Sequence, residues 1–345
     1  MEKYLKSSEN KSIWKMHRDC LTKVGLVKKK KAYGFTNNKI FKYAVLFFTN
    51  LWACKKFSYL FEHRKVYIPG VTSKGLKFNV YESNLAPLIR CFHIQDIPGC
   101  GWVKSDSHTL VDSSEKESIC DYEIMLPYTN LLPIEKDCNA PLRICSFDIE
   151  CYSYDGKFPQ ARRSKDKIIQ IGSTYNYLGN KEIYRQHIVT LDTCNKIEGA
   201  VVESFDNEKD LLRGWVNEIK SNDVDILTGY NIFYFDEKYI YDRAKLLNID
   251  FDVSYMSKLN TYKCKFLEQK LASNALGENI LKYYDTPGIV HIDLMKDVQK
   301  TYKLESYKLD NVAGSFIKGE IESIKKVKKN KYELYCKKIT DLRKD

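Results

Sequence analysis

Two carboxylates spaced two positions apart in an apolar run are the first residues that could do chemistry. The run is RICSFDIEC at 143–151, and its acids are Asp148 and Glu150. In an extended strand, residues two apart point to one face, so both carboxylates would lie opposite Phe147 and Ile149. Neighbouring carboxylates raise each other's pKa unless a cation lies between them, and Mg²⁺ binds through carboxylate oxygens. The run therefore predicts an acidic ledge, Asp148 and Glu150, that binds a divalent metal.

The spacing alone is weak evidence, because such a pair should occur about once by chance in a chain of ordinary composition. It occurs twice more, at Asp121/Glu123 and at Asp206/Glu208, both in polar surroundings. There the simplest interpretation is a solvated pair. Only the pair at 148 and 150 lies within a largely apolar strand, and this context favours a functional site.

A third acid follows about 85 residues later, in the sequence LTGYNIFYFD. A strand is expected to end at Gly229, and Asn231 could cap the turn into the next helix. Asp236 would lie near the first turn of that helix, where the helix dipole favours a negative charge. By itself Asp236 is most simply a helix cap. If the turn lies beside the first strand, Asp236 becomes a third oxygen ligand of a two-metal site.

The elements that would position these acids follow from hydrophobic periodicity. The segment from about residue 141 onward alternates strand patterns with helix patterns, which is typical of an α/β layer. The strands are expected at Arg143–Tyr152, Lys167–Tyr177, Lys181–Leu191, Asp225–Gly229 and Gly288–Asp293, and the helices at Glu208–Lys220, Glu237–Leu247 and Leu294–Tyr302.

The chain before residue 141 has a different texture. Residues 1–35 are Lys-rich, and the run Lys28–Lys31 is most simply a solvated tail, with nuclear targeting or polyanion contact as alternatives. Residues 36–140 contain short apolar segments separated by Gly and Pro, which predict an α+β or mostly β domain. Within it, Tyr43–Cys54 is expected to form a buried strand or a short helix.

Composition limits the class of protein. The 345 residues include 56 Lys+Arg against 45 Asp+Glu, a net charge of +11, which indicates a polyanionic partner or a solvated Lys-rich surface. The 11 Cys form no C-x-x-C pair, so neither zinc spacing nor a disulfide framework is expected. No apolar targeting segment begins the chain, and no run is long enough to span a bilayer. We therefore expect a soluble intracellular protein with no membrane partner.

Several motifs in order resemble the N-terminal and 3′–5′ exonuclease domains of family B DNA polymerases, especially the delta-like enzymes of large DNA viruses. The sequence FDIEC at 147–151 is similar to the first exonuclease motif, and NIFYFD at 231–236 to the second. KFP at 157–159 and IIQIG at 168–172 resemble the sequence that follows the first motif. Upstream, YESN at 81–84, LIR at 88–90 and GWV at 101–103 resemble the N-terminal domain, and SYKLDNVA at 306–313 resembles a later exonuclease segment.

The resemblance implies an RNase H-like exonuclease fold, α/β with a mixed sheet flanked by helices, after a mostly β N-terminal domain. It implies proofreading hydrolysis with two divalent ions, Mg²⁺ or Mn²⁺, and binding of DNA and nucleotide. By the resemblance Asp148 would bridge the metals, Glu150 would bind one and orient water, and Asp236 would bind the other. Candidate DNA contacts are Tyr230, Asn231, Phe235, Lys157, Arg162 and Arg163, while Tyr307 and Asp310 lie in the later exonuclease segment. Packing beneath the site is the simpler role for Tyr230 and Phe235, and a charged loop for the three cations.

The sequence also departs from the family. The third exonuclease motif, Y-x-x-x-D, is not found after Tyr307, since Tyr307–Asp310 has the wrong spacing and Asp341 has Lys337 in the Tyr position. Asp293 is most simply a strand-end or cap residue rather than a substitute ligand. We therefore expect a fragment of a polymerase, from an incomplete gene model or a split gene, that alone cannot synthesise DNA and degrades 3′ ends weakly or not at all.

This interpretation divides the chain into a Lys-rich extension (1–35), an N-terminal domain (36–140) and an incomplete exonuclease domain (141–345). The expected partners are a single-stranded 3′ end or a primer–template and, for a split gene, the rest of the polymerase on another chain. The location would be the host nucleus or a cytoplasmic viral factory. The alternatives are a non-catalytic nucleic-acid-binding or assembly module and an RNase-like exonuclease of the same fold.

Overall fold

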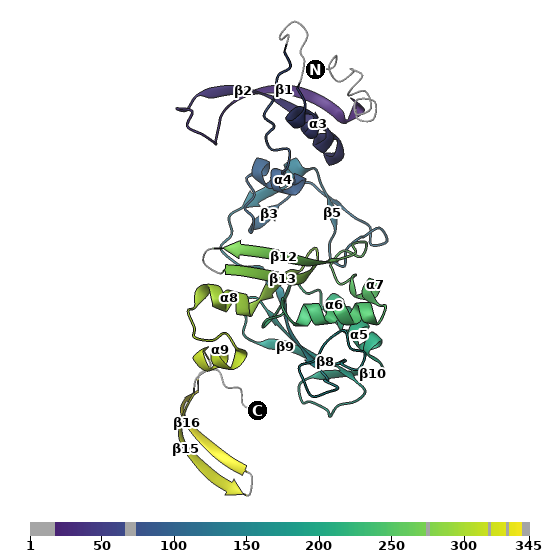
Figure 1. Cartoon of the computed structure of the whole chain (residues 1–345), viewed down its shortest axis with the longest axis vertical. Helices are drawn as coiled ribbons and strands as arrows, with labels where there is room; N and C mark the ends of the chain where they lie inside the picture. The colour runs from purple at the N-terminus through teal and green to yellow at the C-terminus, as the bar shows by residue number, and fades with distance from the viewer. Residues whose placement is uncertain (1–17, 66–73, 274–276, 317–318, 329–330, 340–345) are drawn as a thin grey trace. The chain divides into compact units, whose positions relative to one another are not determined.

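The computed structural model describes residues 18–65, 74–273, 277–316, 319–328 and 331–339 (Figure 1). The first residues, from which a secretory signal was excluded, lie outside these ranges. The chain forms two compact units, one of residues 1–108 and 126–136, the other of 109–125 and 137–345. The segment 109–125 thus packs with the second unit, although the sequence suggested that it belongs to the first domain.

A mixed sheet forms the centre of the second unit, as the sequence predicted, but it has six strands rather than the five expected, because β10 was not predicted (Figure 1). Its order is β10-β9-β8-β7-β11-β14. The strands β7, β8 and β9 form an antiparallel meander, while β10 pairs in parallel with β9, β11 with β7, and β14 with β11. The bounds are β7 (Arg143–Cys151), β8 (Ile168–Tyr177), β9 (Ile183–Leu191), β10 (Val201–Phe205), β11 (Ile226–Gly229) and β14 (Val290–Asp293).

The main core lies between this sheet and the helices α5 (Glu208–Ser221) and α6 (Asp236–Leu246). Asn207 begins α5, since its side chain accepts a hydrogen bond from the Asp210 amide at 3.0 Å. The predicted apolar stripe of α5 is buried, and Trp215 lies 5.0 Å from the ring of Phe147 on β7. One face of β7 is therefore held by packing, which fixes the direction of the opposite face.

The remaining elements of the second unit surround this core. The hairpin of β12 (Lys265–Ser273) and β13 (Gly277–Asp285) was not predicted, and neither was α9 (Leu309–Phe316). The predicted helix after β14 is confirmed as α8 (Leu294–Thr301). The other elements are β4 (Thr109–Leu110), β5 (Ile124–Met125), α7 (Asp250–Val253) and the hairpin of β15 (Gly319–Lys328) and β16 (Lys331–Ile339).

The first unit combines a long hairpin with two helices. The hairpin joins β1 (Leu21–Lys30) to β2 (Ile40–Phe48), and α3 (Leu51–His63) packs against it through Phe57, Leu60 and Phe61 (Figure 1). The other elements are the 3₁₀ turns Arg18–Cys20 and Tyr128–Asn130, α4 (Pro87–Gln95), β3 (Trp102–Lys104) and β6 (Leu132–Ile134). No helix in the described part of the chain combines the length and apolar character needed to cross a bilayer.

Two expectations for this unit were wrong. Lys28–Lys31 is not a tail, because Lys28, Lys29 and Lys30 belong to β1 and pair with residues 40–42 of β2. The segment Tyr43–Cys54 is not one element: β2 ends at Phe48, and Asn50 begins α3 by accepting a hydrogen bond from the Ala53 amide at 2.9 Å. The first expectation failed because of a strand partner and the second because of a helix cap, and hydrophobic periodicity detects neither.

Candidate active site

The acidic ledge, Asp148 and Glu150, lies on the face of β7 opposite the core. Both side chains are exposed, whereas Phe147, which precedes Asp148, and Ile149, which lies between the two acids, are buried. The predicted alternation is therefore confirmed. In the neighbouring strand Gly172 pairs with Asp148, and a side chain at Gly172 would meet open space. The surface beside Asp148 is thus free for a ligand.

The third acid joins the ledge through the backbone. β7 pairs with β11 only from Ile144 to Ser146, so β7 extends past the end of its neighbour. The Ile149 amide, beyond that end, donates to Asp236 Oδ1 at 3.2 Å. Asp236 is the first residue of α6, as the sequence predicted, and is 2% exposed. The two motifs, 87 residues apart, therefore meet at the carboxyl end of β7.

The pKa values of Asp148 and Asp236 are both raised above that of a free carboxyl group. Burial and, to a smaller extent, the charge of Asp148 raise the pKa of Asp236 to about 7, against the hydrogen bond from Ile149, which lowers it. The pKa of Asp148 is raised by burial and by Glu150, while its hydrogen bond with Asp236 lowers it. Two neighbouring carboxylates that form a hydrogen bond share one proton or bind a cation between them.

Asp293 has a structural role, as expected from its position at a strand end. It caps α8 by accepting from the Met295 amide at 2.9 Å. It also accepts from the amides of Asn231 at 2.8 Å and Phe233 at 3.1 Å, which fixes the turn between β11 and α6. Asn231 adopts a left-handed backbone conformation there, with a φ of 64°. It does not cap α6 as predicted, because the N-cap residue is Phe235.

Gly229 allows the strand β11 to approach β7 closely at the ledge. A Cβ atom at this position would lie 2.5 Å from the carbonyl oxygen of Phe147 and 2.6 Å from Ile232 Cγ2. Such distances do not occur between real atoms, so any larger residue must displace the backbone next to Asp148. Glycine is therefore required here by contact rather than by conformational freedom.

The loop from Tyr152 to Lys167, which follows the ledge, is anchored by buried charges. Arg243 on α6 pairs with Glu208 on α5 and donates to the carbonyls of Ala161 at 3.0 Å and Arg163 at 2.7 Å. Asp166 is fully buried and accepts from the amides of Tyr154 and Gln160. Fixed at these points, the loop presents Phe158, which is 73% exposed and lies 5.3 Å from the Phe235 ring.

The three predicted cations of this loop differ in availability. Lys157 and Arg162 are exposed. Arg163 is half-buried, and its guanidinium donates to Asp155 at 3.0 Å and lies 3.7 Å from Asp166. Arg163 therefore holds the loop together, whereas Lys157 and Arg162 have freer side chains.

The predicted aromatic residues pack, and only some of them lie near the acids. Phe235 is partly buried against the core and touches Tyr239. The Tyr230 hydroxyl donates to the carbonyl of Tyr307, which brings the segment 306–313 to the turn after β11. Asp310 is exposed in the first turn of α9 and is not among the groups that shift the pKa of Asp148 or Asp236.

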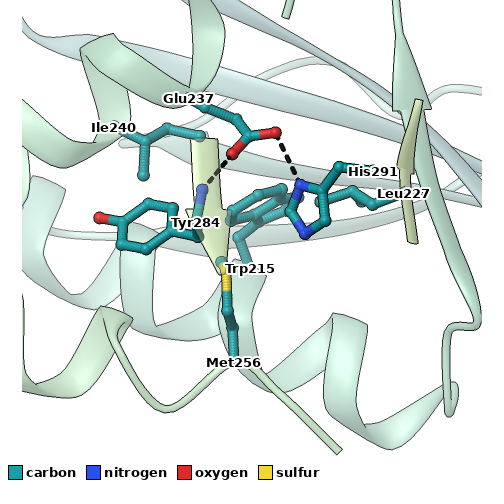
Figure 2. Close-up of a pocket in the computed structure, with 7 residues that line it drawn as sticks. All are labelled: Trp215, Leu227, Glu237, Ile240, Met256, Tyr284 and His291. Atoms are coloured by element: carbon teal, nitrogen blue, oxygen red, sulfur yellow. Dashed lines mark hydrogen bonds and ion pairs between the residues drawn. The ribbon is translucent and has the colours of Figure 1, made fainter. Parts of the chain in front are cut away.

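A buried chain of polar groups beside Asp236 was missed from the sequence (Figure 2). Glu237 accepts from the Tyr284 amide at 2.8 Å and from His291 Nδ1 at 2.7 Å. His291 Nε2 lies 2.6 Å from the Thr286 hydroxyl. These contacts tie the start of α6 to β13 and β14. Only the adjacency of two acids, Asp236 and Glu237, could have signalled that one of them faces inward.

A hard divalent cation fits this site in part. Asp148 and Asp236 offer neighbouring oxygen ligands, and the pKa of each carboxyl group is raised first by burial, a cost that a bound cation would offset. In the described residues no three His, Cys, Asp or Glu side chains converge closely enough to hold a metal. Glu150 is exposed on the same face of β7, but it does not complete such a group with Asp148 and Asp236.

Comparison with known proteins is consistent with this geometry. Residues 78–312 match the family model described as DNA polymerase family B, exonuclease domain. The chain is 33% identical to a DNA polymerase of Acanthamoeba polyphaga mimivirus over 88% of its length, and 34% identical to the DNA polymerase delta catalytic subunit of Caenorhabditis elegans over 71%. These alignments cover 21% and 23% of the two relatives, so the chain spans about a fifth of their length.

A solved structure shares the fold. The family B DNA polymerase of Pyrobaculum calidifontis aligns with 86% of this chain and 31% of its own, with a TM-score of 0.54 and 17% identity. At this identity the similarity establishes architecture alone. It agrees with the mixed sheet and flanking helices described above.

Proposed function

This chain belongs to the family B DNA polymerases, as part of their exonuclease region, and from that premise we propose that its acidic site hydrolyses the 3′-terminal phosphodiester of DNA. The observation that supports this most directly is the hydrogen bond from Ile149 to Asp236, which brings Asp236 to the acidic ledge. The two motifs would otherwise be unrelated acids in a basic chain.

Each acid has a role that its surroundings suit. Asp148, which interacts with both Asp236 and Glu150, would help to hold the two cations. Asp236, held by the Ile149 amide, would bind one of them, and the exposed Glu150 would bind the other and orient the attacking water. Bound Mg²⁺ or Mn²⁺ would supply a nucleophilic hydroxide and stabilise the leaving 3′ oxygen. The carboxylates supply positioning and the charge that holds the cations.

Phe158 and the nearby cations would hold the DNA end. The exposed Phe158 ring, supported by Phe235, offers a flat surface for an unpaired terminal base. Lys157 and Arg162 would contact phosphates. In the same proposal, the exonuclease domain is residues 141–345 together with 109–125, and the rest of 36–140 forms the N-terminal domain with the strand at 21–30. The remaining polymerase domains would act on a primer–template in the host nucleus or a viral factory.

Metal binding tests the site without requiring turnover. We expect Mn²⁺, followed by electron paramagnetic resonance of the free ion, to bind the purified chain and to bind Asp148→Ala and Asp236→Ala at least tenfold more weakly. Asp206→Ala removes an exposed acid from another D-x-E pair and serves as the matched control. Equal binding by all four proteins would contradict the assigned ligands.

Hydrolysis tests the reaction itself. With a 5′-labelled single-stranded oligonucleotide and Mn²⁺, we expect slow shortening from the 3′ end, absent in Asp148→Ala and retained in Asp206→Ala. A slow rate is expected because, in the described residues, the three carboxylates do not form one metal-binding group. Metal binding with no hydrolysis under any condition would instead favour a non-catalytic DNA-binding module.

Stacking by Phe158 has its own signal. An oligonucleotide with 2-aminopurine at its 3′ end should lose fluorescence on binding when the base stacks on Phe158. Phe158→Leu should abolish that change, whereas Tyr154→Leu, an exposed aromatic residue of the same loop, should retain it. An equal signal from both variants would show that the base lies elsewhere.

A further inference from the structure

The hairpin β1–β2 has a charge distribution that the exonuclease site does not explain. From Cys20 to Phe61 the chain has nine Lys and no Asp or Glu. Seven of these Lys lie between Leu21 and Phe48, which is the hairpin itself. A two-stranded sheet does not need such charge for its stability, because lysines opposite one another repel.

The strand register sorts these residues onto two faces. Lys23 pairs with Phe47, Val27 with Tyr43, and Lys29 with Phe41, so these odd-numbered residues share one face. Lys28 pairs with Lys42 on the opposite face. We define the Lys–aromatic face as Lys23, Lys29, Lys31, Lys39, Phe41, Tyr43 and Phe47.

Cations and rings on this face lie in contact distance of one another. Lys31 Nζ is 4.7 Å from the centre of the Phe41 ring, and Lys39 Nζ is 5.8 Å from it. Lys23 Nζ is 5.8 Å from the Phe47 ring. Phe47 is 46% exposed, and its ring lies beside Gly25, which is diagonal to it in the hairpin, so that a Cβ atom at Gly25 would be 3.6 Å from the ring. Phe47 is therefore presented to solvent, whereas Phe41 and Tyr43 are half-buried outside the α3 core, with the Tyr43 ring 5.7 Å from that of Tyr81.

We propose that the Lys–aromatic face binds single-stranded DNA, with bases stacked on Phe41 and Phe47 and phosphates on the surrounding lysines. Alternating aromatic positions along a strand, bordered by lysines, provide the stacking surface and the cationic track that unpaired nucleic acid needs. Duplex DNA would match the charge but could not offer its bases to the rings. The choice of DNA over RNA rests on the proposed function, whereas the binding surface does not.

The test is the affinity of the full chain for a 5′-fluorescein single-stranded DNA in EDTA, measured by fluorescence anisotropy at several salt concentrations. Phe41→Leu with Phe47→Leu should weaken binding about fivefold or more, because one stacked base contributes at least that factor. Lys29→Ala with Lys31→Ala should reduce the slope of log affinity against log salt by about 1.4, since each lost phosphate contact contributes about 0.7.

The hairpin provides its own control. Lys28→Ala with Lys30→Ala removes the same charge from the same strand but from the opposite face, and should change the slope by less than half as much. Thermal unfolding of each variant must match the unsubstituted chain, and Lys29→Arg with Lys31→Arg should restore the slope. Mn²⁺ binding at Asp148 should be unchanged in all of them, which separates this surface from the exonuclease site.

Several outcomes would overturn the proposal. Equal losses from both lysine pairs would indicate diffuse attraction without a defined face. Unchanged affinity in the phenylalanine variant would exclude stacking, and so would equal binding of duplex DNA. Tighter binding of RNA of the same sequence would overturn the choice of DNA. If the substituted chains lost binding to anionic phospholipid vesicles but kept their binding to DNA, the face would be a membrane-binding surface.

Discussion

At the scale of single residues, Asp236 combines deep burial with proximity to another acid. Its pKa of about 7 compares with 3.8 for an unperturbed carboxyl group. Between these values the folded, metal-free chain keeps a proton that the unfolded chain releases. The free energy of unfolding therefore falls as pH rises from about 4 to about 7, and the stabilising effect of protonation is lost above that window.

This pH dependence can be measured. In EDTA, the melting temperature of Asp236→Asn should fall less across pH 4–7 than that of the unsubstituted chain, because the amide keeps an oxygen for Ile149 without ionising. Asp206→Asn, at an exposed position, should behave like the unsubstituted chain. Adding Mg²⁺ at pH 8 should raise the melting temperature of the unsubstituted chain and leave Asp236→Asn unchanged. Identical pH profiles for the first two proteins would refute the assignment.

At the scale of elements, the close contact of β11 with β7 sets the geometry of the ledge. Gly229→Ala should destabilise the second unit by about 1–3 kcal/mol, because its Cβ would overlap the Phe147 carbonyl and Ile232. Gly172→Ala is the matched control on β8, where nothing lies within 4 Å of the added Cβ. Chemical denaturation of both variants checks this, and equal stability of Gly229→Ala and Gly172→Ala would contradict it.

The link between α6 and its neighbouring strands is also an element-scale feature. Glu237→Ala should cost about 2–3 kcal/mol, since it leaves the buried Tyr284 amide and His291 without their acceptor. Lys245→Ala, exposed near the end of α6, should change stability by less than about 0.5 kcal/mol. The variant Glu237→Ala should also bind Mn²⁺ more weakly, because the start of α6 holds Asp236. Unchanged Mn²⁺ binding would show that α6 keeps its position without this link.

Sequence periodicity predicted the sheet well and the site in part. β7, β8, β9, α5 and α6 have the expected bounds to within a few residues, because each has one buried face that imposes a period on the sequence. The same-face position of Asp148 and Glu150 followed from that period. The position of Asp236 beside the first strand was expected from the small α/β layer and from the family resemblance, but its contact with the Ile149 amide was not predicted, since no local pattern reports a partner 87 residues away.

What was missed depends on tertiary contacts. The hairpin β12–β13 has little alternation in its sequence, and aromatic stacking on α6 holds it, with Phe266 4.0 Å from Tyr241. The acceptor role of Glu237 depends on β13 and β14, which come together only in the fold. The Lys28–Lys31 run was expected to be a solvated tail, because its strand partner lies beyond the turn and leaves no local pattern in the sequence.

At the scale of the whole molecule, the chain consists of two compact units with separate cores. Calorimetry should therefore resolve two unfolding transitions rather than one. Phe57→Ala, in the core beneath the hairpin, should lower one transition, and Gly229→Ala should lower the other. A single transition that both substitutions shift equally would show that the units unfold together.

The extension of β7 beyond β11 has one more consequence. The Ile149 amide proton points at Asp236 rather than at a strand, so its environment changes with the charge on that carboxylate. The chemical shift of this amide proton should therefore change when Asp236 is protonated, and should change to a different value when a cation binds. The Ile149 amide thus reports whether the acidic site holds a proton or a metal ion, without substrate, fluorescent probe or turnover.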